Sequence, residues 1–270
     1  MSDPGVPPSP ARRTVPFRGG GFAPQSRSWI SWATLVVVLG AWQGAVSGGL
    51  VSPIFLPSPW TILLALKSLI VSGELWRHLA ASLSRIGLGW ALGTMAGIVV
   101  GVMMGLFTSF RSGGIPMVSA LYPIPKIALL PLFILWFGIG ETPKIVTIGF
   151  GVFFATVIAT FTGVDGVPRS LIRMGQSFGM PMFGIVRKIL LPGALPGILA
   201  GFRISASTAL LLVVSAEMVG AQLGIGSFVL SAGNLMQTDQ LLAGVAVLSV
   251  LGLMIGLLLS RLEKWLLRWR

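Results

Sequence analysis

The chain has 270 residues, of which 54% are hydrophobic and only 10% are charged, and its mean hydropathy is +0.91. Because a soluble domain carries about a quarter charged residues, this composition excludes a water-facing globular protein and predicts one embedded in the lipid bilayer. The formal charge of +12 comes from short basic segments between apolar runs, which argues against a nucleic-acid partner, and the lack of cysteine excludes disulfides and thiolate sites.

The N-terminal part of the chain predicts a tail followed by a first membrane helix. Residues 1–27 are rich in proline and arginine, which predicts a disordered cytoplasmic tail. The apolar run over 29–46 predicts a retained span; a signal peptide is the alternative, but the basic leader is long for that role. Residues 47–83 contain three prolines and several polar residues, and we expect an outer connection with a short interfacial helix such as 61–71.

Further apolar runs complete the prediction of an all-α membrane protein with about six transmembrane helices. The expected spans are 29–46, 85–107, 115–138, 144–162, 199–221 and 241–260, with turns at 110–114 and 140–143 and a loop over 163–198. With the N-terminus inside, 14 of the 19 Lys and Arg residues fall on the inner side, so we expect both termini and the 163–198 loop to be cytoplasmic.

The second expected span carries a glycine at every fourth position: Gly89, Gly93, Gly97, Gly101 and Gly105. This spacing places the glycines on one helix face, where missing side chains let another helix backbone approach closely. We interpret the stripe as packing within the chain, and a contact between subunits is the alternative.

The 163–198 loop has an apolar pattern of its own. Leu171, Met174 and Phe178 fall at helical spacing, Gly179 permits a bend, and Pro181 suits the first turn of a second short helix. We expect Pro192 and Pro196 to end this unit before the fifth span. Two short helices joined by glycine could form a docking surface for a partner or could lie flat on the lipid interface.

A resemblance to a known family decides between these readings. The run Arg173-Met174-Gly175-Gln176-Ser177-Phe178-Gly179, followed after nine residues by Ile189-Leu190-Leu191-Pro192, resembles the EAA loop of ABC-importer permeases. Arg173, Met174 and Gly175 stand where that motif has Glu-Ala-Ala. The resemblance implies that the loop couples to an ATPase. The residues carried over are Arg173, Met174, Gly175, Phe178, Gly179, Ile189, Leu191 and Pro192.

Other segments are similar to the nitrate, sulfonate and taurine branch of these permeases. They include Leu56-Pro57-Ser58-Pro59, Pro123-Ile124-Pro125-Lys126, the run from Pro131 to Gly140, Gly201-Phe202-Arg203 and Ala216-Glu217-Met218. The resemblance implies a type I ABC-importer permease fold over residues 28–270 in a bacterial inner membrane. The implied partners are a second copy of the chain, two cytoplasmic ATP-binding subunits and an extracytoplasmic solute-binding protein. The implied cargo is a small anion, with aliphatic sulfonate, taurine or nitrate as candidates.

Two charged residues within the apolar spans are candidates for the transport path. Lys126 lies near the middle of the third expected span, where an ammonium costs roughly 2.5–3.5 kcal/mol or more. It either attracts an anion or satisfies carbonyls freed by Pro123 and Pro125. Glu217, near the outer end of the fifth span, could pair with Lys126 or hold an outer gate, and we favour a structural pairing.

The sequence offers little for catalysis. It contains no Gly-x-x-x-x-Gly-Lys-Ser/Thr phosphate loop, no metal-ligand cluster and no acid–base pair, so we expect a non-catalytic subunit without cofactor or metal. A self-sufficient secondary transporter or channel is the alternative, because it would also lack a phosphate loop. A membrane-embedded enzyme is disfavoured.

Overall fold

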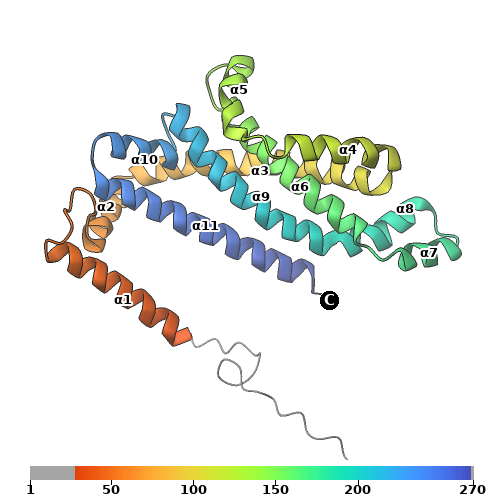
Figure 1. The fold of residues 1–270 in the computed structure, drawn as a ribbon, viewed down its shortest axis with the longest axis horizontal. Helices are drawn as coiled ribbons and strands as arrows, with labels where there is room; N and C mark the ends of the chain where they lie inside the picture. The colour runs from red at the N-terminus through yellow and green to blue at the C-terminus, as the bar shows by residue number, and fades with distance from the viewer. Residues whose placement is uncertain (1–27, 269–270) are drawn as a thin grey trace, which may run out of the picture.

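The computed structural model describes residues 28–268, which form helices and no strands (Figure 1). This confirms the all-α class. The tail expected over 1–27 lies outside the described residues. The helices are α1 (Ser28–Ser47), α2 (Pro59–Val71), α3 (Glu74–Leu106), α4 (Thr108–Leu121), α5 (Leu130–Phe137), α6 (Thr142–Asp165), α7 (Arg169–Ser177), α8 (Met182–Ile185), α9 (Leu191–Gly220), α10 (Ile225–Asn234) and α11 (Thr238–Leu266).

Four helices in the described part of the chain are long and apolar enough to cross a membrane. They are α3, α6, the continuous run Met182–Gly220 that contains α9, and α11. A fifth is counted if α4 and the segment Lys126–Phe137 form one bent span. The apolar part of α1, Trp32–Ser47, is shorter than such a helix. The expected count of six is therefore not confirmed.

The segment before the second expected span is more regular than the sequence indicated. The short helix expected near 61–71 is present as α2, which starts at Pro59 and is capped by Ser58 Oγ, an acceptor for Thr61 N at 3.2 Å. The helix that contains the second expected span begins well before 85, because α3 starts at Glu74 and runs for 33 residues. At 1.5 Å per residue α3 is about 50 Å long, so its polar first turns can extend beyond an apolar core of about 30 Å.

The third expected span, 115–138, is not one helix. Residues 110–114 are inside α4 rather than in a turn, and the chain reverses at Phe107 instead. The helix α4 ends at Leu121, and the segment Lys126–Phe137, a 3₁₀ turn followed by α5, leaves it at an angle of 89°. The cause is Pro123 and Pro125, because proline lacks an N–H donor and restricts the residue before it. Figure 1 shows α5 projecting from the bundle as a result.

Helices α3, α6 and α9 form the centre of the bundle and lie side by side (Figure 1). Each glycine of the α3 stripe faces α6. A Cβ on Gly89 would lie 2.7 Å from Ile148, on Gly97 2.7 Å from Thr156 and on Gly101 2.6 Å from Thr160. Gly93 and Gly105 face Gly149 and Val164 just as closely. The structure therefore places the whole stripe in packing within the chain.

The long loop expected over 163–198 is mostly helical. The helix α6 extends to Asp165, and α8 continues through a π-helical turn, Val186–Leu190, directly into α9. The expectation that Pro192 and Pro196 end the unit is wrong, because the helix runs without a break from Met182 to Gly220 and contains both prolines. A proline inside a helix removes one backbone hydrogen bond, and the wider π turn at 186–190, just before Pro192, accommodates that loss.

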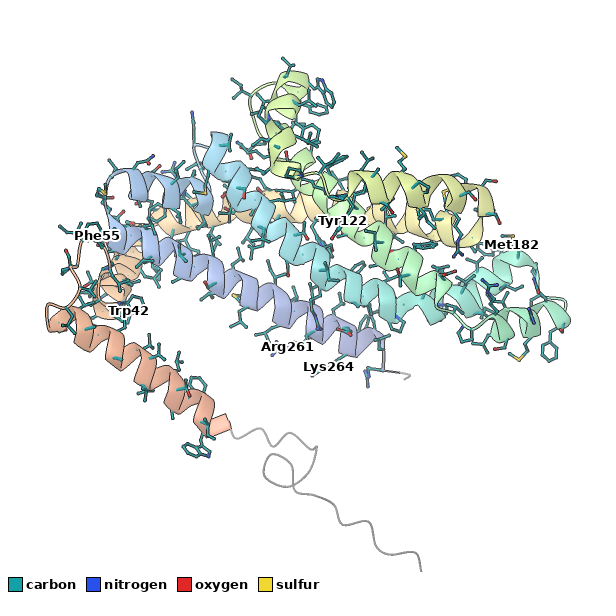
Figure 2. The ribbon with its side chains drawn as sticks, viewed as in Figure 1. Trp42, Phe55, Tyr122, Met182, Arg261 and Lys264 are labelled. Carbon is teal, nitrogen blue, oxygen red and sulfur yellow. The ribbon has the colours of Figure 1, made fainter. Side chains whose placement is uncertain are left out.

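The two ends of the bundle differ in composition. Figure 2 shows Arg261 and Lys264 on the last turns of α11 and Met182 at the α7–α8 end, whereas Trp42 and Phe55 lie at the opposite end. The exposed basic residues Arg169, Arg173, Arg187 and Lys188 all belong to the segment between α6 and α9. We call the Trp42 and Phe55 end the aromatic end and the other the basic end.

Candidate functional site

The α7–α8 hairpin, residues 169–190, lies at the basic end and is built around one glycine. Gly179 has φ +68°, a left-handed conformation that only glycine adopts without strain. The turn is closed by Gly179 N donating to Gln176 O at 2.9 Å and by Met180 N donating to Gly175 O at 3.1 Å. An added Cβ on Gly179 would meet nothing, so its role is conformational and its surroundings are open.

Residues that the sequence singled out fall on both sides of this hairpin. Gly175 is buried, and a Cβ there would lie 2.8 Å from Ile189 Cδ1, so it lets α7 pack against the turn that precedes α9. Arg173, Met174, Phe178, Leu191 and Pro192 are exposed. Phe178 and Phe183, at the tip, are 79% and 74% exposed. The hairpin thus presents large apolar side chains to its surroundings.

The base of the hairpin is packed against two long helices. Val164, Val167, Leu190, Ala194 and Ile198 form one buried cluster that joins the end of α6 to the start of α9. Beside it, Arg111 at the start of α4 donates to Asp165 Oδ1 at 2.7 Å. Packed contacts therefore join the base of the hairpin to both α6 and α9.

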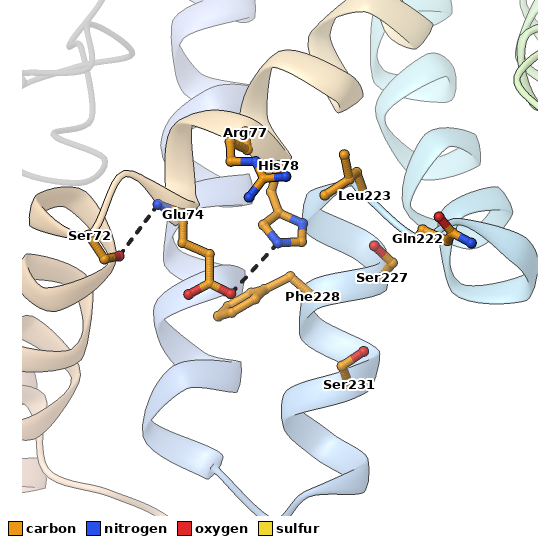
Figure 3. Close-up of a pocket in the computed structure, with 9 residues that line it drawn as sticks. All are labelled: Ser72, Glu74, Arg77, His78, Gln222, Leu223, Ser227, Phe228 and Ser231. Atoms are coloured by element: carbon orange, nitrogen blue, oxygen red, sulfur yellow. Dashed lines mark hydrogen bonds and ion pairs between the residues drawn. The ribbon is translucent and has the colours of Figure 1, made fainter.

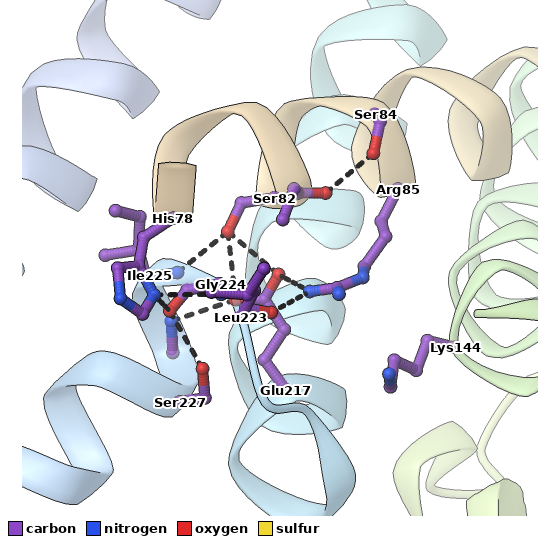
Figure 4. A network of polar contacts seen from close by, with 12 residues as sticks. His78, Ser82, Ser84, Arg85, Lys144, Glu217, Leu223, Gly224, Ile225 and Ser227 are labelled. Atoms are coloured by element: carbon purple, nitrogen blue, oxygen red, sulfur yellow. Dashed lines mark hydrogen bonds and ion pairs between the residues drawn. The ribbon is translucent and has the colours of Figure 1, made fainter. Parts of the chain in front are cut away.

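A polar network lies between α3 and the turn from α9 to α10 (Figure 4). Its centre is Glu217, whose side chain is fully buried. The carboxylate accepts from Arg85 Nη1 at 2.6 Å, from Gly226 N at 2.9 Å and from Ser82 Oγ, which lies 2.8 and 3.0 Å from its two oxygens. Gly224 is required beside it, because a Cβ there would overlap the carboxylate.

The structure gives Glu217 a different partner from the one considered in the sequence. Its cation is Arg85 on α3, not Lys126. Arg85 is 3% exposed, and its Nη1 also donates to Leu223 O at 2.6 Å. The spacing of His78, Ser82 and Arg85, at i, i+4 and i+7, places the three side chains on one helix face. The sequence contains this spacing, but a helix expected to start at 85 leaves His78 and Ser82 outside it.

Arg85 also binds a second carboxylate, that of Glu141 in the connection between α5 and α6. Its Nε donates to Glu141 Oε2, and its Nη2 donates to Oε1 at 2.9 Å. Lys144 Nζ donates to the same Oε1 at 3.2 Å. Glu141 lies outside the membrane-spanning segments, and the hydrogen bond from Arg85 holds its pKa at about 2. Its side chain is nevertheless 56% exposed, unlike those of Arg85 and Lys144.

Two cavities flank this network. One, of about 540 Å³, is lined by residues that include Arg85, Glu141, Lys144 and Gln222. The other, also about 540 Å³, lies around Glu74, Arg77 and His78 (Figure 3). Beside it, His78 Nδ1 lies 2.9 Å from Gly224 O and 3.1 Å from Gly224 N. Gln222 and Leu223 line both cavities, so the α9–α10 turn separates them.

Lys126 occupies the break between α4 and α5. Its ammonium donates to Tyr122 O and lies 3.5 Å from Leu121 O, and it is 5.0 and 5.4 Å from the ring centroids of Tyr122 and Phe154. These contacts match the interpretation in which lysine satisfies carbonyls freed by the helix break. The carbonyls belong to the last turn of α4, one turn before the lysine.

The fold and these sites define an integral membrane protein with several apolar helices. Its apolar helices bury an ion network, and its exposed hairpin presents apolar side chains at the basic end. Within residues 28–268, no group of three His, Asp or Glu side chains is placed to hold a metal ion.

The comparisons with known proteins place the chain in a family. It belongs to the family described as "Binding-protein-dependent transport system inner membrane component", whose sequence model matches residues 93–270. The taurine transport system permease protein TauC of Escherichia coli K12 is 38% identical over 245 residues, which cover 89% of each chain. The putative aliphatic sulfonates transport permease protein SsuC of Bacillus subtilis 168 is 38% identical over 87% of this chain and 85% of its own length.

A solved structure shows the same fold. The MetNI methionine ABC transporter in an inward-facing conformation contains a chain that superposes with a TM-score of 0.64 at 24% identity, over 71% of this chain and 95% of that one. Together with the family match and the two relatives, this confirms the resemblance to ABC-importer permeases. The chain is a multi-pass inner-membrane protein of binding-protein-dependent transport.

Proposed function

We propose that this chain is the permease subunit of an ATP-driven importer of small organosulfonates, and that the α7–α8 hairpin is its contact with a separate ATPase. The observation that carries the proposal is the exposure of Phe178 and Phe183 at the tip of a hairpin whose base is buried against α6 and α9. Large apolar side chains gathered in this way mark interaction sites. The names of the two relatives, which transport taurine and aliphatic sulfonates, support the cargo class.

The geometry supports a lever mechanism. The run Met182–Gly220 is one continuous helical body of 39 residues, about 58 Å long, from the hairpin to the Glu217 network. The glycine stripe locks α3 to α6 at backbone distance. A motor that moves the hairpin would therefore shift the central helices as a body. Their other end would then rearrange around Glu217 and Glu141.

The remaining partners follow from the family. A second copy of this chain would complete the path across the membrane, two ATP-binding subunits would each hold one hairpin, and an external solute-binding protein would deliver the cargo. The hairpin and both termini would then face the cytoplasm, in agreement with the basic residues gathered there. ATP hydrolysis would be confined to the partner subunits.

Co-purification with the ATP-binding subunits tests the hairpin contact. Phe178→Asp places a charge at the apolar tip without filling any packed space, and we expect it to abolish capture of the co-expressed ATP-binding subunit. Phe55→Asp, at a position 82% exposed near the aromatic end, is the matched control and should capture the subunit normally. If Phe178→Asp captures the ATP-binding subunit at the wild-type level, the hairpin is not the contact with that subunit.

A secondary transporter is the competing function. Vesicles that contain this chain alone would then accumulate sulfonate in response to an ion gradient. Under the proposal they accumulate none until the ATP-binding subunits and ATP are supplied.

A further inference from the structure

A group of four charges lies where the helices are otherwise apolar, and only one of its members is exposed. Arg85, Lys144 and Glu217 have side chains at most 7% exposed, whereas the side chain of Glu141 is 56% exposed. The buried members come from α3, α6 and α9, so their positions are fixed by the bundle. Glu141 belongs to the short connection between α5 and α6.

The guanidinium of Arg85 has two sides with different partners. On the buried side, Nη1 donates to Glu217 and to Leu223 O. Nε and Nη2 point to the Glu141 carboxylate and hold it with two parallel hydrogen bonds. This fork fits any planar pair of anionic oxygens, whether from a carboxylate or from another oxyanion. The ammonium of Lys144 adds a third donor on the same carboxylate oxygen as Nη2.

Glu141 lies in the short connection between α5 and α6, beside two glycines. Gly138 has φ +77° and Gly140 has φ +159°, both conformations that favour glycine. Ile139 between them is 94% exposed, so its side chain packs little against the described part of the chain. Arg85 and Lys144, in contrast, lie inside the helices α3 and α6.

Without Glu141, the cluster carries a net charge of +1. Arg85 and Lys144 contribute two positive charges, and Glu217 contributes one negative charge that is already fully hydrogen-bonded inside. Two buried cations with only one buried carboxylate would favour a monoanion. The adjacent cavity of about 540 Å³ lies within the range of small-molecule sites, roughly 300–1,000 Å³.

We propose that Arg85 and Lys144 form a binding site for the sulfonate group of the cargo, and that the Glu141 carboxylate occupies this site until the cargo displaces it. The inference rests on the proposed function for the cargo class. A sulfonate offers two oxygens to the Arg85 fork and a third to Lys144. The displaced Glu141 carboxylate moves into water, which its exposure already permits. The α5–α6 connection then releases its tie to α3.

Direct binding to the purified full chain in lipid nanodiscs tests the site. The probe is ethanesulfonate, titrated with ligand-detected NMR, and dimethyl sulfone is the uncharged control ligand. We expect Glu141→Ala to tighten ethanesulfonate binding at least tenfold over wild type, because the competing carboxylate is gone. Adding Lys144→Gln to that variant should reverse the gain. Neither variant should bind dimethyl sulfone.

The matched control is Glu263→Ala, which removes a carboxylate bound to an arginine, Arg203, at 2.7 Å near the basic end. It should leave ethanesulfonate affinity unchanged. Glu141→Gln, which keeps the side-chain shape, gives the same direction of change if the alanine variant does not fold. Unchanged or weaker binding to both Glu141 variants would overturn the proposal and leave Glu141 as a structural tie.

The two proposals fail separately. Loss of ATP-binding subunit capture in Phe178→Asp concerns only the hairpin, which lies at the other end of α9. If that test succeeds and the Glu141 variants show no gain in ethanesulfonate binding, the sulfonate site is wrong and the permease function stands.

Discussion

Removal of Arg85 is the most informative perturbation of the fold. Arg85→Met keeps most of the side-chain length but removes the charge from the guanidinium site between α3 and the α9–α10 turn. Glu217 then keeps Ser82 Oγ and Gly226 N as donors, but its fully buried charge loses its cation. Leu223 O also loses its donor.

The expected cost follows from burial. Removing one partner of a buried ion pair costs about 3–5 kcal/mol, because the other charge stays behind without compensation. The lost contact with Glu141 adds less than about 1 kcal/mol, since that carboxylate is largely exposed. Neutralising both partners should cost much less, so Arg85→Met combined with Glu217→Gln should recover at least half of the loss.

Equilibrium unfolding in mixed detergent micelles, followed by circular dichroism, measures both values. Wild type, the two single variants and the double variant form a cycle, and we expect a coupling energy of about 2 kcal/mol or more between Arg85 and Glu217. A cost below about 1 kcal/mol for Arg85→Met, or losses that simply add in the double variant, would refute the buried-pair argument.

Two other properties can be checked in the same preparations. Gly97→Ala should destabilise the chain by about 1–3 kcal/mol, because its Cβ would lie 2.7 Å from Thr156. Gly87→Ala, on the same helix with nothing within 4 Å, is the control and should be neutral or stabilising. Equal effects of the two substitutions would contradict the packing of the stripe. Glu141 has a folded pKa of about 2, below its usual 4.5, so its contribution is present above pH 4.5 and is lost as the pH falls towards 2. The melting temperatures of wild type and Glu141→Gln should therefore converge over that interval, and a constant difference would contradict the assigned ion pair.

Much of the architecture could be predicted from the sequence because a bilayer imposes strong requirements on composition. Long apolar runs predicted the membrane-spanning parts of α3, α6, α9 and α11, and the spacing of four predicted a close helix contact at the glycine stripe. The pattern of Leu171, Met174 and Phe178 together with Gly179 predicted two short helices with a glycine bend. The structure contains the first helix, α7, and the bend at Gly179, but the second helix continues without a break into α9.

The errors have physical causes. Hydropathy reports the solvent around a segment and not its hydrogen bonds, so the apolar run 115–138 predicts one span although Pro123 and Pro125 break it. Conversely, Pro192 and Pro196 predict breaks, although both are tolerated inside the continuous helix Met182–Gly220. Glu217 and its partner Arg85 are 132 residues apart in the sequence, so no local pattern identifies the pair.

The central claim is that the α7–α8 hairpin faces the cytoplasm, where it contacts separate ATP-binding subunits. This claim has a direct test. The chain has no cysteine, so Ser177→Cys at an exposed position of the hairpin and Ser52→Cys at an exposed position before α2 provide single labels. With a membrane-impermeant maleimide, the account predicts labelling of Ser52→Cys but not Ser177→Cys in cells whose inner membrane is intact and accessible, and the reverse in inverted vesicles. Labelling of Ser177→Cys from the outside would contradict it.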